Sequence, residues 1–203
     1  MRIGILGGTF NPPHTGHLIV AREAMKKAGL DKIVFIPCGN PPHKDASDIP
    51  DGKYRIEMVR LAIEGHSGFE ISDIEVVDKG KSYTAKTLEK LNRIYPEDRL
   101  CFIVGADSLC QMKGWFCPAE IFRQAEIVVA DRGGMENCDL EETIEYYRAK
   151  YNADITKITM DTIDMSSSDI RKRIKCDQSI KDMVCDKVID YIYKSGIYKG
   201  NRE

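Results

Sequence analysis

The sequence predicts a doubly wound α/β domain built on a mainly parallel sheet, and two features of the chain support this fold class. Short apolar runs, typical of buried strands, alternate with amphipathic stretches of helical period. Most links between them are short, as in βαβ units with right-handed crossovers. The length of 203 residues suits a single domain over residues 1–203, with a C-terminal helical portion over about 165–203.

The first predicted unit is a strand, a glycine turn and a helix. Residues 2–6 are aliphatic or β-branched enough to form a buried strand. Gly7 and Gly8 then allow a tight turn and a close backbone approach to a ligand, and two prolines delay the helix. The helix begins over residues 14–17, and its apolar stripe recurs at spacings of three and four: Leu18, Ala21, Met25 and Ala28.

Two histidines, His14 and His17, fall in the first turn of that helix and on one face of it. Free N–H groups and the positive end of the helix dipole attract phosphate to this position. Two imidazole donors there would stabilise charge that develops on a phosphate during displacement. The glycine spacing is neither a dinucleotide fingerprint nor a P-loop. The alternatives are ordinary capping or surface histidines, or a zinc pair, although zinc has no evident third and fourth ligand.

The remaining elements follow in alternation. Strands are expected at residues 32–37, 70–77, 99–104, 125–130 and 155–160. Helices are expected at residues 53–65, from an N-cap at Ser82 or Thr84 up to Pro96, at 140–151, after Ser166 and at 180–191. The long loop at 38–52 leaves the carboxyl end of a strand, which in this fold class is the ligand edge.

Three further positions allow both a structural and a functional interpretation. Lys44, on a proline-stiffened loop, is either a solvated lysine or a phosphate ligand. Asp107, just after a strand, suits a ribose hydroxyl and a helix cap equally well. Trp115, followed by Phe116 in a loop or short helical turn, is either a core residue or a stacking surface for a planar base.

The segment Met165–Arg171 contains a well-specified helix start. Ser166 as N-cap places Asp169 at N3, a variant of the capping box, and Met165 and Ile170 at hydrophobic-staple positions. Capping does not explain three consecutive hydroxyls with Arg171 one turn into the helix. Hydroxyls, free N–H groups and a guanidinium together predict a triphosphate site.

Composition excludes several classes of function. The formal net charge of -2 offers no basic excess for a nucleic acid polymer, and no segment approaches the length of a membrane span. The 7 cysteines are scattered without metal-binding spacing, which favours a reduced, cytoplasmic protein. The first strand begins at once and leaves no room for a signal peptide. The oligomeric state, monomer or homo-oligomer, stays open.

The stretch GGTFNPPHTGHL resembles the signature of the H-x-G-H nucleotidyltransferases, and within them of the bacterial nicotinate mononucleotide adenylyltransferases. PPHK at residues 41–44, the Tyr83–Thr84 pair and Trp115 point to that branch. GAD at 105–107 resembles the family's adenosine-side motif, and MSSSDIR is similar to the superfamily's I-S-S-T-x-I-R, with mild changes at Met165 and Ser168. The chain departs further from the family in two places. Phe116 stands where the family has a tyrosine or similar residue, and Arg132 lacks the following proline.

The resemblance implies roles for individual residues. Catalytic roles fall on His14, His17, Lys44 and Arg171. ATP would be bound by Gly8, Thr9, Phe10, His14, His17, Gly105, Asp107, Ser166, Ser167, Ser168 and Arg171. Nicotinate mononucleotide would be bound by Asn40, His43, Lys44, Tyr83, Thr84, Trp115, Phe116 and Arg132.

The reaction implied is ATP plus nicotinate mononucleotide giving nicotinate adenine dinucleotide and pyrophosphate. Mg²⁺ would be bound mostly through the nucleotide, with no protein metal site. One alternative is another H-x-G-H nucleotidyltransferase of the pantetheine-phosphate type, which should lack PPHK and the tryptophan–aromatic pair. The other is a non-catalytic nucleotide sensor, which has no need of transition-state donors.

Overall fold

Six strands form one parallel sheet in the computed structural model, which describes residues 1–40, 49–78, 80–133, 139–162 and 164–198. The strands are β1 (Arg2–Gly8), β2 (Lys32–Pro37), β3 (Phe69–Ile71), β4 (Arg99–Gly105), β5 (Glu126–Asp131) and β6 (Ile155–Thr159). Their order is β3-β2-β1-β4-β5-β6, and every neighbouring pair is parallel. The order reverses between β1 and β4, so the predicted doubly wound fold is confirmed and its ligand crevice lies there.

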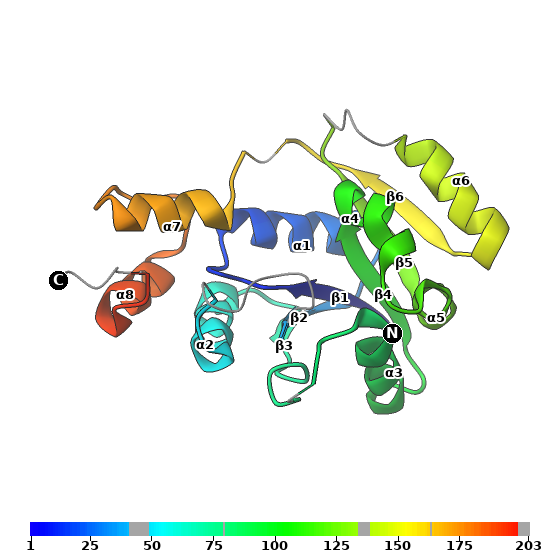
Figure 1. Ribbon diagram of the computed structural model, residues 1–203, viewed down its shortest axis with the longest axis horizontal. Helices are drawn as coiled ribbons and strands as arrows, with labels where there is room; N and C mark the ends of the chain where they lie inside the picture. Colours follow the sequence, from blue (N-terminus) through cyan, green and yellow to red (C-terminus); the bar gives the residue numbers. More distant parts are fainter. Residues whose placement is uncertain (41–48, 79, 134–138, 163, 199–203) are drawn as a thin grey trace.

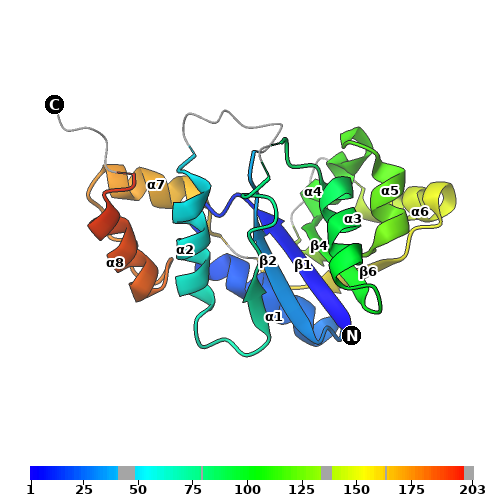
Figure 2. The ribbon, with the colours of Figure 1, turned by 90° about the horizontal axis from the view of Figure 1, so that it is seen from below.

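Helices cover both faces of this sheet, and Figure 1 shows α1 and α3 on opposite sides of it. One core lies beneath α1 (Thr15–Lys27), α2 (Gly52–Ile63), α7 (Ser167–Lys175) and α8 (Asp186–Ser195). The other lies beneath α3 (Thr84–Ile94), α4 (Ala106–Gln111), α5 (Pro118–Gln124) and α6 (Leu140–Tyr151). In Figure 2, α7 and α8 lie beside α2 at one end of the molecule.

The strands β1, β2, β4 and β5 form continuous apolar runs in the sequence because they are buried on both faces. Along β4, Cys101 and Ile103 enter the first core, whereas Leu100, Phe102 and Val104 enter the second. This alternation is the two-residue period of a strand, and two-sided burial is typical of parallel sheets. The apolar runs in the sequence therefore predicted both the strands and their central position.

Two predicted elements are shorter than expected. The strand predicted at residues 70–77 ends at Ile71, because the N–H groups of Val76 and Val77 both bond the carbonyl of Asp73, at 2.8 and 3.0 Å, and turn the chain. The helix predicted at 180–191 begins only at Asp186, although Ile180 and Val184 are buried in the first core. In both cases, apolar residues outside regular structure pack into a core. Their spacing in the sequence is similar to that of a strand or a helix, which is why the predicted elements were too long.

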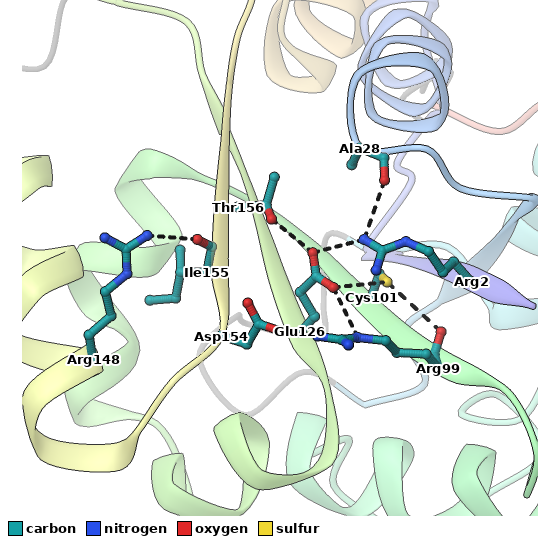
Figure 3. A network of polar contacts seen from close by, with 9 residues as sticks. All are labelled: Arg2, Ala28, Arg99, Cys101, Glu126, Arg148, Asp154, Ile155 and Thr156. Atoms are coloured by element: carbon teal, nitrogen blue, oxygen red, sulfur yellow. Dashed lines mark hydrogen bonds and ion pairs between the residues drawn. The ribbon is translucent and has the colours of Figure 1, made fainter.

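The amino-terminal edge of the sheet is held together by a buried carboxylate, shown in Figure 3. Glu126, only 4% exposed, accepts hydrogen bonds from Arg2 Nη2 at 2.9 Å and from Thr156 Oγ1 at 2.9 Å. Its other oxygen lies 3.1 Å from Arg99 Nε. Burial alone would raise the pKa of Glu126, but the bonds from Arg2 and Thr156 and the charges of both arginines lower it overall. One carboxylate thus joins β1, β4, β5 and β6 at the edge opposite the crevice.

Replacing Glu126 with glutamine is expected to lower the free energy of unfolding by about 2 kcal/mol at pH 7, because Arg2 loses its counter-charge and Arg99 keeps only its pair with Asp154. The folded-state pKa of Glu126 is lowered, so its contribution is present above the unfolded pKa and is lost as pH falls. Urea unfolding at pH 7 and near pH 4 tests this. The difference in the free energy of unfolding between wild type and Glu126→Gln should become smaller at the lower pH. A difference that is constant with pH would contradict the role of the Glu126 carboxylate. Glu120→Gln, which removes an exposed pair with Arg123, is the matched control.

Candidate active site

The two histidines predicted at the start of the first helix lie together beyond the carboxyl end of β1. His14 is the N-cap of α1, in extended conformation, and His17 lies in the first turn. Their ring centroids are 3.8 Å apart. The backbone N–H of His14 donates to Nδ1 of His17 at 3.1 Å. Since Nδ1 of His17 accepts this bond, the proton of its neutral ring is on Nε2, which is left available as a donor.

Burial keeps both imidazoles neutral. It lowers the pKa of His17 to about 3, assisted by the charges of His14 and Arg132. It also lowers the pKa of His14 to about 4, again assisted by Arg132. The ring of Phe10 packs edge-on against His17 at 5.0 Å. At neutral pH both rings are therefore uncharged hydrogen-bonding groups. Nδ1 of His14 is buried and has no hydrogen-bond partner among the residues that the structure describes.

Arg132 lies at the carboxyl edge of the neighbouring part of the sheet. It follows β5, and a Cβ added to Gly105, at the end of β4, would lie 3.6 Å from Arg132 Nη2. Its charge acts on the pKa of both histidines. The hydroxyl of Thr162 bonds the carbonyl of Arg132 at 2.8 Å. The structure therefore places the guanidinium near the crevice without the proline that the family has after this arginine.

The serine–arginine motif starts α7 as predicted. Ser166 is the N-cap and accepts from the N–H of Asp169 at 3.1 Å. Ser167 Oγ donates to the carbonyl of Pro12 at 2.8 Å, and Arg171 Nη1 donates to the carbonyl of Asn11 at 2.8 Å. These two bonds dock α7 onto the turn between β1 and α1. Sequence analysis predicted the helix cap but not this anchoring role of the motif.

A cavity of about 150 Å³ lies at the carboxyl end of β1, between the sheet and α3. Its lining includes Gly8 and the predicted ligand residues Thr84 and Trp115. The other lining residues were not predicted as ligands: Ile5, Gly7, Ile36, Cys38, Glu75, Ser82, Thr87, Leu88 and Phe102. Tyr83 and Phe116, also predicted ligands, pack against each other at 4.6 Å and are not among the lining residues.

The start of α3 corrects the predicted cap. Tyr83, not Ser82 or Thr84, is the N-cap, and its side chain makes no capping bond. The hydroxyl of Ser82 instead accepts from the N–H groups of Gly39 and Asn40, at 3.0 and 3.2 Å, and so holds the loop after β2. Thr84 becomes the first helical residue. Within the described part of the chain, the N–H groups of Thr84 and Ala85 have no hydrogen-bond acceptor.

For the remaining residues that were predicted to bind substrates, the roles stay predictions. His43 and Lys44 lie outside the described residues, so their roles stay predictions. Asp107 is exposed in the first turn of α4. The carbonyl of Thr9 accepts a bond from Arg55, and Ser168 accepts one from Arg171.

Comparison with known proteins places this geometry in a family. The sequence profile of the cytidylyltransferase-like family matches residues 5–173. A probable nicotinate-nucleotide adenylyltransferase of Clostridium botulinum (strain Alaska E43 / Type E3) is 43% identical, with 98% of each chain covered. One of Caldicellulosiruptor bescii is 41% identical, with 98% of this chain and 100% of the relative covered. The chain belongs to the nicotinate-nucleotide adenylyltransferase family, within the cytidylyltransferase-like group.

Solved structures agree with this fold. The nicotinic acid mononucleotide adenylyltransferase of Plasmodium falciparum, complexed with NaAD, superposes with a TM-score of 0.82 at 21% identity. The alignment covers 100% of this chain and 99% of that one. At this identity the likeness concerns the fold alone, and it extends the adenylyltransferase architecture over the whole length of the chain.

Arg55 is a structural residue of this adenylyltransferase site that sequence analysis missed. It is 2% exposed, and its guanidinium donates to the carbonyls of Thr9, Gly39 and Pro50 at 3.0, 3.4 and 2.9 Å. It therefore joins the turn after β1 to the loop after β2, on either side of the crevice. A signal was present in the sequence, because Arg55 precedes the buried Met58 and Val59 at helical spacing.

The cysteines differ in part from the prediction that all are reduced. Cys110 is disulfide-bonded. The free cysteines among the described residues are Cys38, Cys101, Cys117, Cys176 and Cys185. In the part of the chain that the structure describes, no helix is long and apolar enough to cross a membrane.

Proposed function

We propose that this chain transfers the adenylyl group of ATP to nicotinate mononucleotide, forming nicotinate adenine dinucleotide and pyrophosphate in NAD biosynthesis. Two features at the carboxyl end of β1, beside the point where the strand order reverses, carry the proposal: the start of α1 with His14 and His17, and a cavity lined by Trp115. We assign the reacting phosphates to the first and the pyridine ring to the second, as the joining of two nucleotides requires.

The reaction is an in-line displacement at the α-phosphorus of ATP. A phosphate oxygen of the mononucleotide forms the new bond to this phosphorus, and the bond to the β-phosphate oxygen breaks and releases pyrophosphate. The Nε2–H of His17 donates to the oxygens of the transferring group, on which negative charge develops. Arg132 neutralises part of the same charge. Positioning and charge stabilisation supply the catalysis, without a covalent intermediate on the protein.

The triphosphate of ATP lies in this proposal across the start of α7, near Ser166, Ser167, Ser168 and Arg171, with Lys44 as a further cation. Among the described residues no group of three or more histidine, cysteine, aspartate or glutamate side chains is placed to hold a metal ion. We propose that a divalent cation, Mg²⁺, is carried by the phosphate oxygens of ATP and reduces their charge. We place the reaction in the cytoplasm.

Pyrophosphate release with ATP and a panel of acceptors tests the proposed function. The panel contains nicotinate mononucleotide, nicotinamide mononucleotide and phosphopantetheine. The highest kcat/KM is expected with nicotinate mononucleotide. Turnover with phosphopantetheine alone would favour the pantetheine-phosphate alternative, and ATP binding without turnover of any acceptor would favour the sensor.

Replacing Arg171 with alanine is expected to lower kcat/KM for ATP by about 10- to 100-fold, the usual scale of a lost charge-assisted hydrogen bond. Arg171→Lys should recover only part of this, because a point charge replaces a bidentate fork. Steady-state kinetics with varied ATP measure the effect. Arg173→Ala, on the same helix, is the control. Unchanged kcat/KM for ATP in both Arg171 variants would remove Arg171 from the ATP site.

A further inference from the structure

The cavity beside α3 contains a carboxylate that the proposed reaction leaves unused. Glu75 lines this cavity together with apolar side chains such as Ile36, Leu88 and Trp115. One of its oxygens accepts a bond from the hydroxyl of Thr87 at 2.6 Å. The chain is held closely at this point, since a Cβ at Gly39 would lie 2.0 Å from the carbonyl oxygen of Glu75. Glu75 is therefore a fixed part of the cavity wall.

No basic side chain forms an ion pair with Glu75 among the described residues, and the neighbouring lysines have other surroundings. Lys90 pairs with Asp78 at 2.5 Å. Lys86 lies over the rings of Tyr83 and Phe116, 5.6 and 5.7 Å from their centroids. Lys81, which is exposed, borders a shallow hollow on the other side of Glu75. The carboxylate of the partly buried Glu75 gives this wall of the cavity a negative charge, which favours a cationic ligand.

The charges along the cavity are ordered. At one end α3 begins with the uncapped N–H groups of Thr84 and Ala85, which with the helix dipole favour an anion. Thr87, which holds Glu75, lies three residues further on the same helix, about 4.5 Å along its axis. The cavity therefore has an anion-binding end and, one turn away, an anionic side chain.

We propose that Glu75 is a specificity-determining residue that selects an aromatic ring carrying a positive charge, a pyridinium, whose own carboxylate points to the start of α3. This inference rests on the proposed function. The ring nitrogen of a pyridine mononucleotide is cationic because it bears the ribose. Glu75 attracts that charge, and it repels the ring carboxylate if the ring enters turned over. Trp115 supplies the stacking face, and Glu75 the recognition of charge and orientation.

The test compares nicotinate mononucleotide with its 1,4-dihydro form, which keeps the carboxylate, ribose and phosphate but has an uncharged ring. Binding is followed by the fluorescence of Trp115, the only tryptophan in the chain, and turnover by pyrophosphate release. Wild type is expected to prefer the charged ring, and Glu75→Gln to lower that preference by about tenfold. Glu75→Asp keeps the charge and should retain most of the preference. Glu70→Gln, which removes a carboxylate paired with Lys32 outside the cavity, is the control.

The outcomes separate this inference from the proposed function. If Glu75→Gln weakened the binding of both ligands equally, or left the ratio of their affinities unchanged, Glu75 would only shape the cavity wall. Either result would overturn the inference. Loss of the preference in Glu75→Asp as well would overturn the role of charge. Absence of pyrophosphate release by wild type would refute the proposed function, whereas the fluorescence titrations would still report whether Glu75 selects the charged ring.

Discussion

Replacing His17 with alanine is expected to lower kcat by about 10²–10³-fold, the usual cost of removing one donor that stabilises transition-state charge. The ring of His17 is buried and neutral, and its Nδ1 is occupied by the N–H of His14. This arrangement fixes the direction of the other ring nitrogen before substrate binds, so no reorganisation is needed at the moment of reaction. The effect should appear in kcat more than in KM for either substrate.

Single-turnover and steady-state measurements of pyrophosphate release decide this prediction, and circular dichroism checks that the variant is folded. His17→Asn is a useful second variant, because its side chain offers an acceptor to the N–H of His14 and tests capping separately from catalysis. His66→Ala is the matched control, since His66 stacks on Phe69 outside the crevice residues. If His17→Ala retained more than about half of the wild-type kcat, the catalytic role would be wrong.

The second large effect expected is a preference for nicotinate over nicotinamide mononucleotide of about 10²-fold or more in kcat/KM. Both rings are cationic and of equal size, so neither stacking on Trp115 nor the attraction of Glu75 to the ring nitrogen separates them. The substituent decides, because the N–H groups of Thr84 and Ala85, which have no acceptor in the described part of the chain, favour a carboxylate. A carboxamide turned with its NH₂ group toward them leaves donors unpaired in a cavity.

Two variants locate this preference. Trp115→Ala should weaken both substrates by similar factors. Thr84→Pro should erode the preference itself, since it removes one N–H donor at the first helical position, where proline is well tolerated. The measurement is kcat/KM for both mononucleotides in each variant. Equal values for the wild-type protein would refute the acid preference and indicate a dual-specificity enzyme.

Local patterns in the sequence predicted those parts of the site that depend on neighbours along the chain. The histidines at the start of α1 follow from a strand, a glycine turn and two prolines in succession. The cap formed by Ser166 and Asp169 spans three residues. The strands β1, β2, β4 and β5 are recognisable in the sequence as apolar runs, because central parallel strands are buried on both faces. Resemblance to a family then suggested the substrates, which neither the hydrophobic periodicity nor the residue spacing of the sequence identifies.

Contacts between distant segments decided the rest. Ser82 lost the predicted cap of α3 because its hydroxyl meets Gly39 and Asn40 from another loop. Arg55 lies at the crevice because its guanidinium bonds the carbonyl of Thr9, which follows β1. Glu75 lies there because its side chain forms part of the cavity wall. The sequence by itself determined the doubly wound fold class, the position of the two histidines at the start of α1 and the cap of α7. Only the tertiary structure decided which backbone N–H groups have no acceptor and which carboxylate has no ion-pair partner among the described residues. Both depend on groups that folding brings together from far apart in the chain.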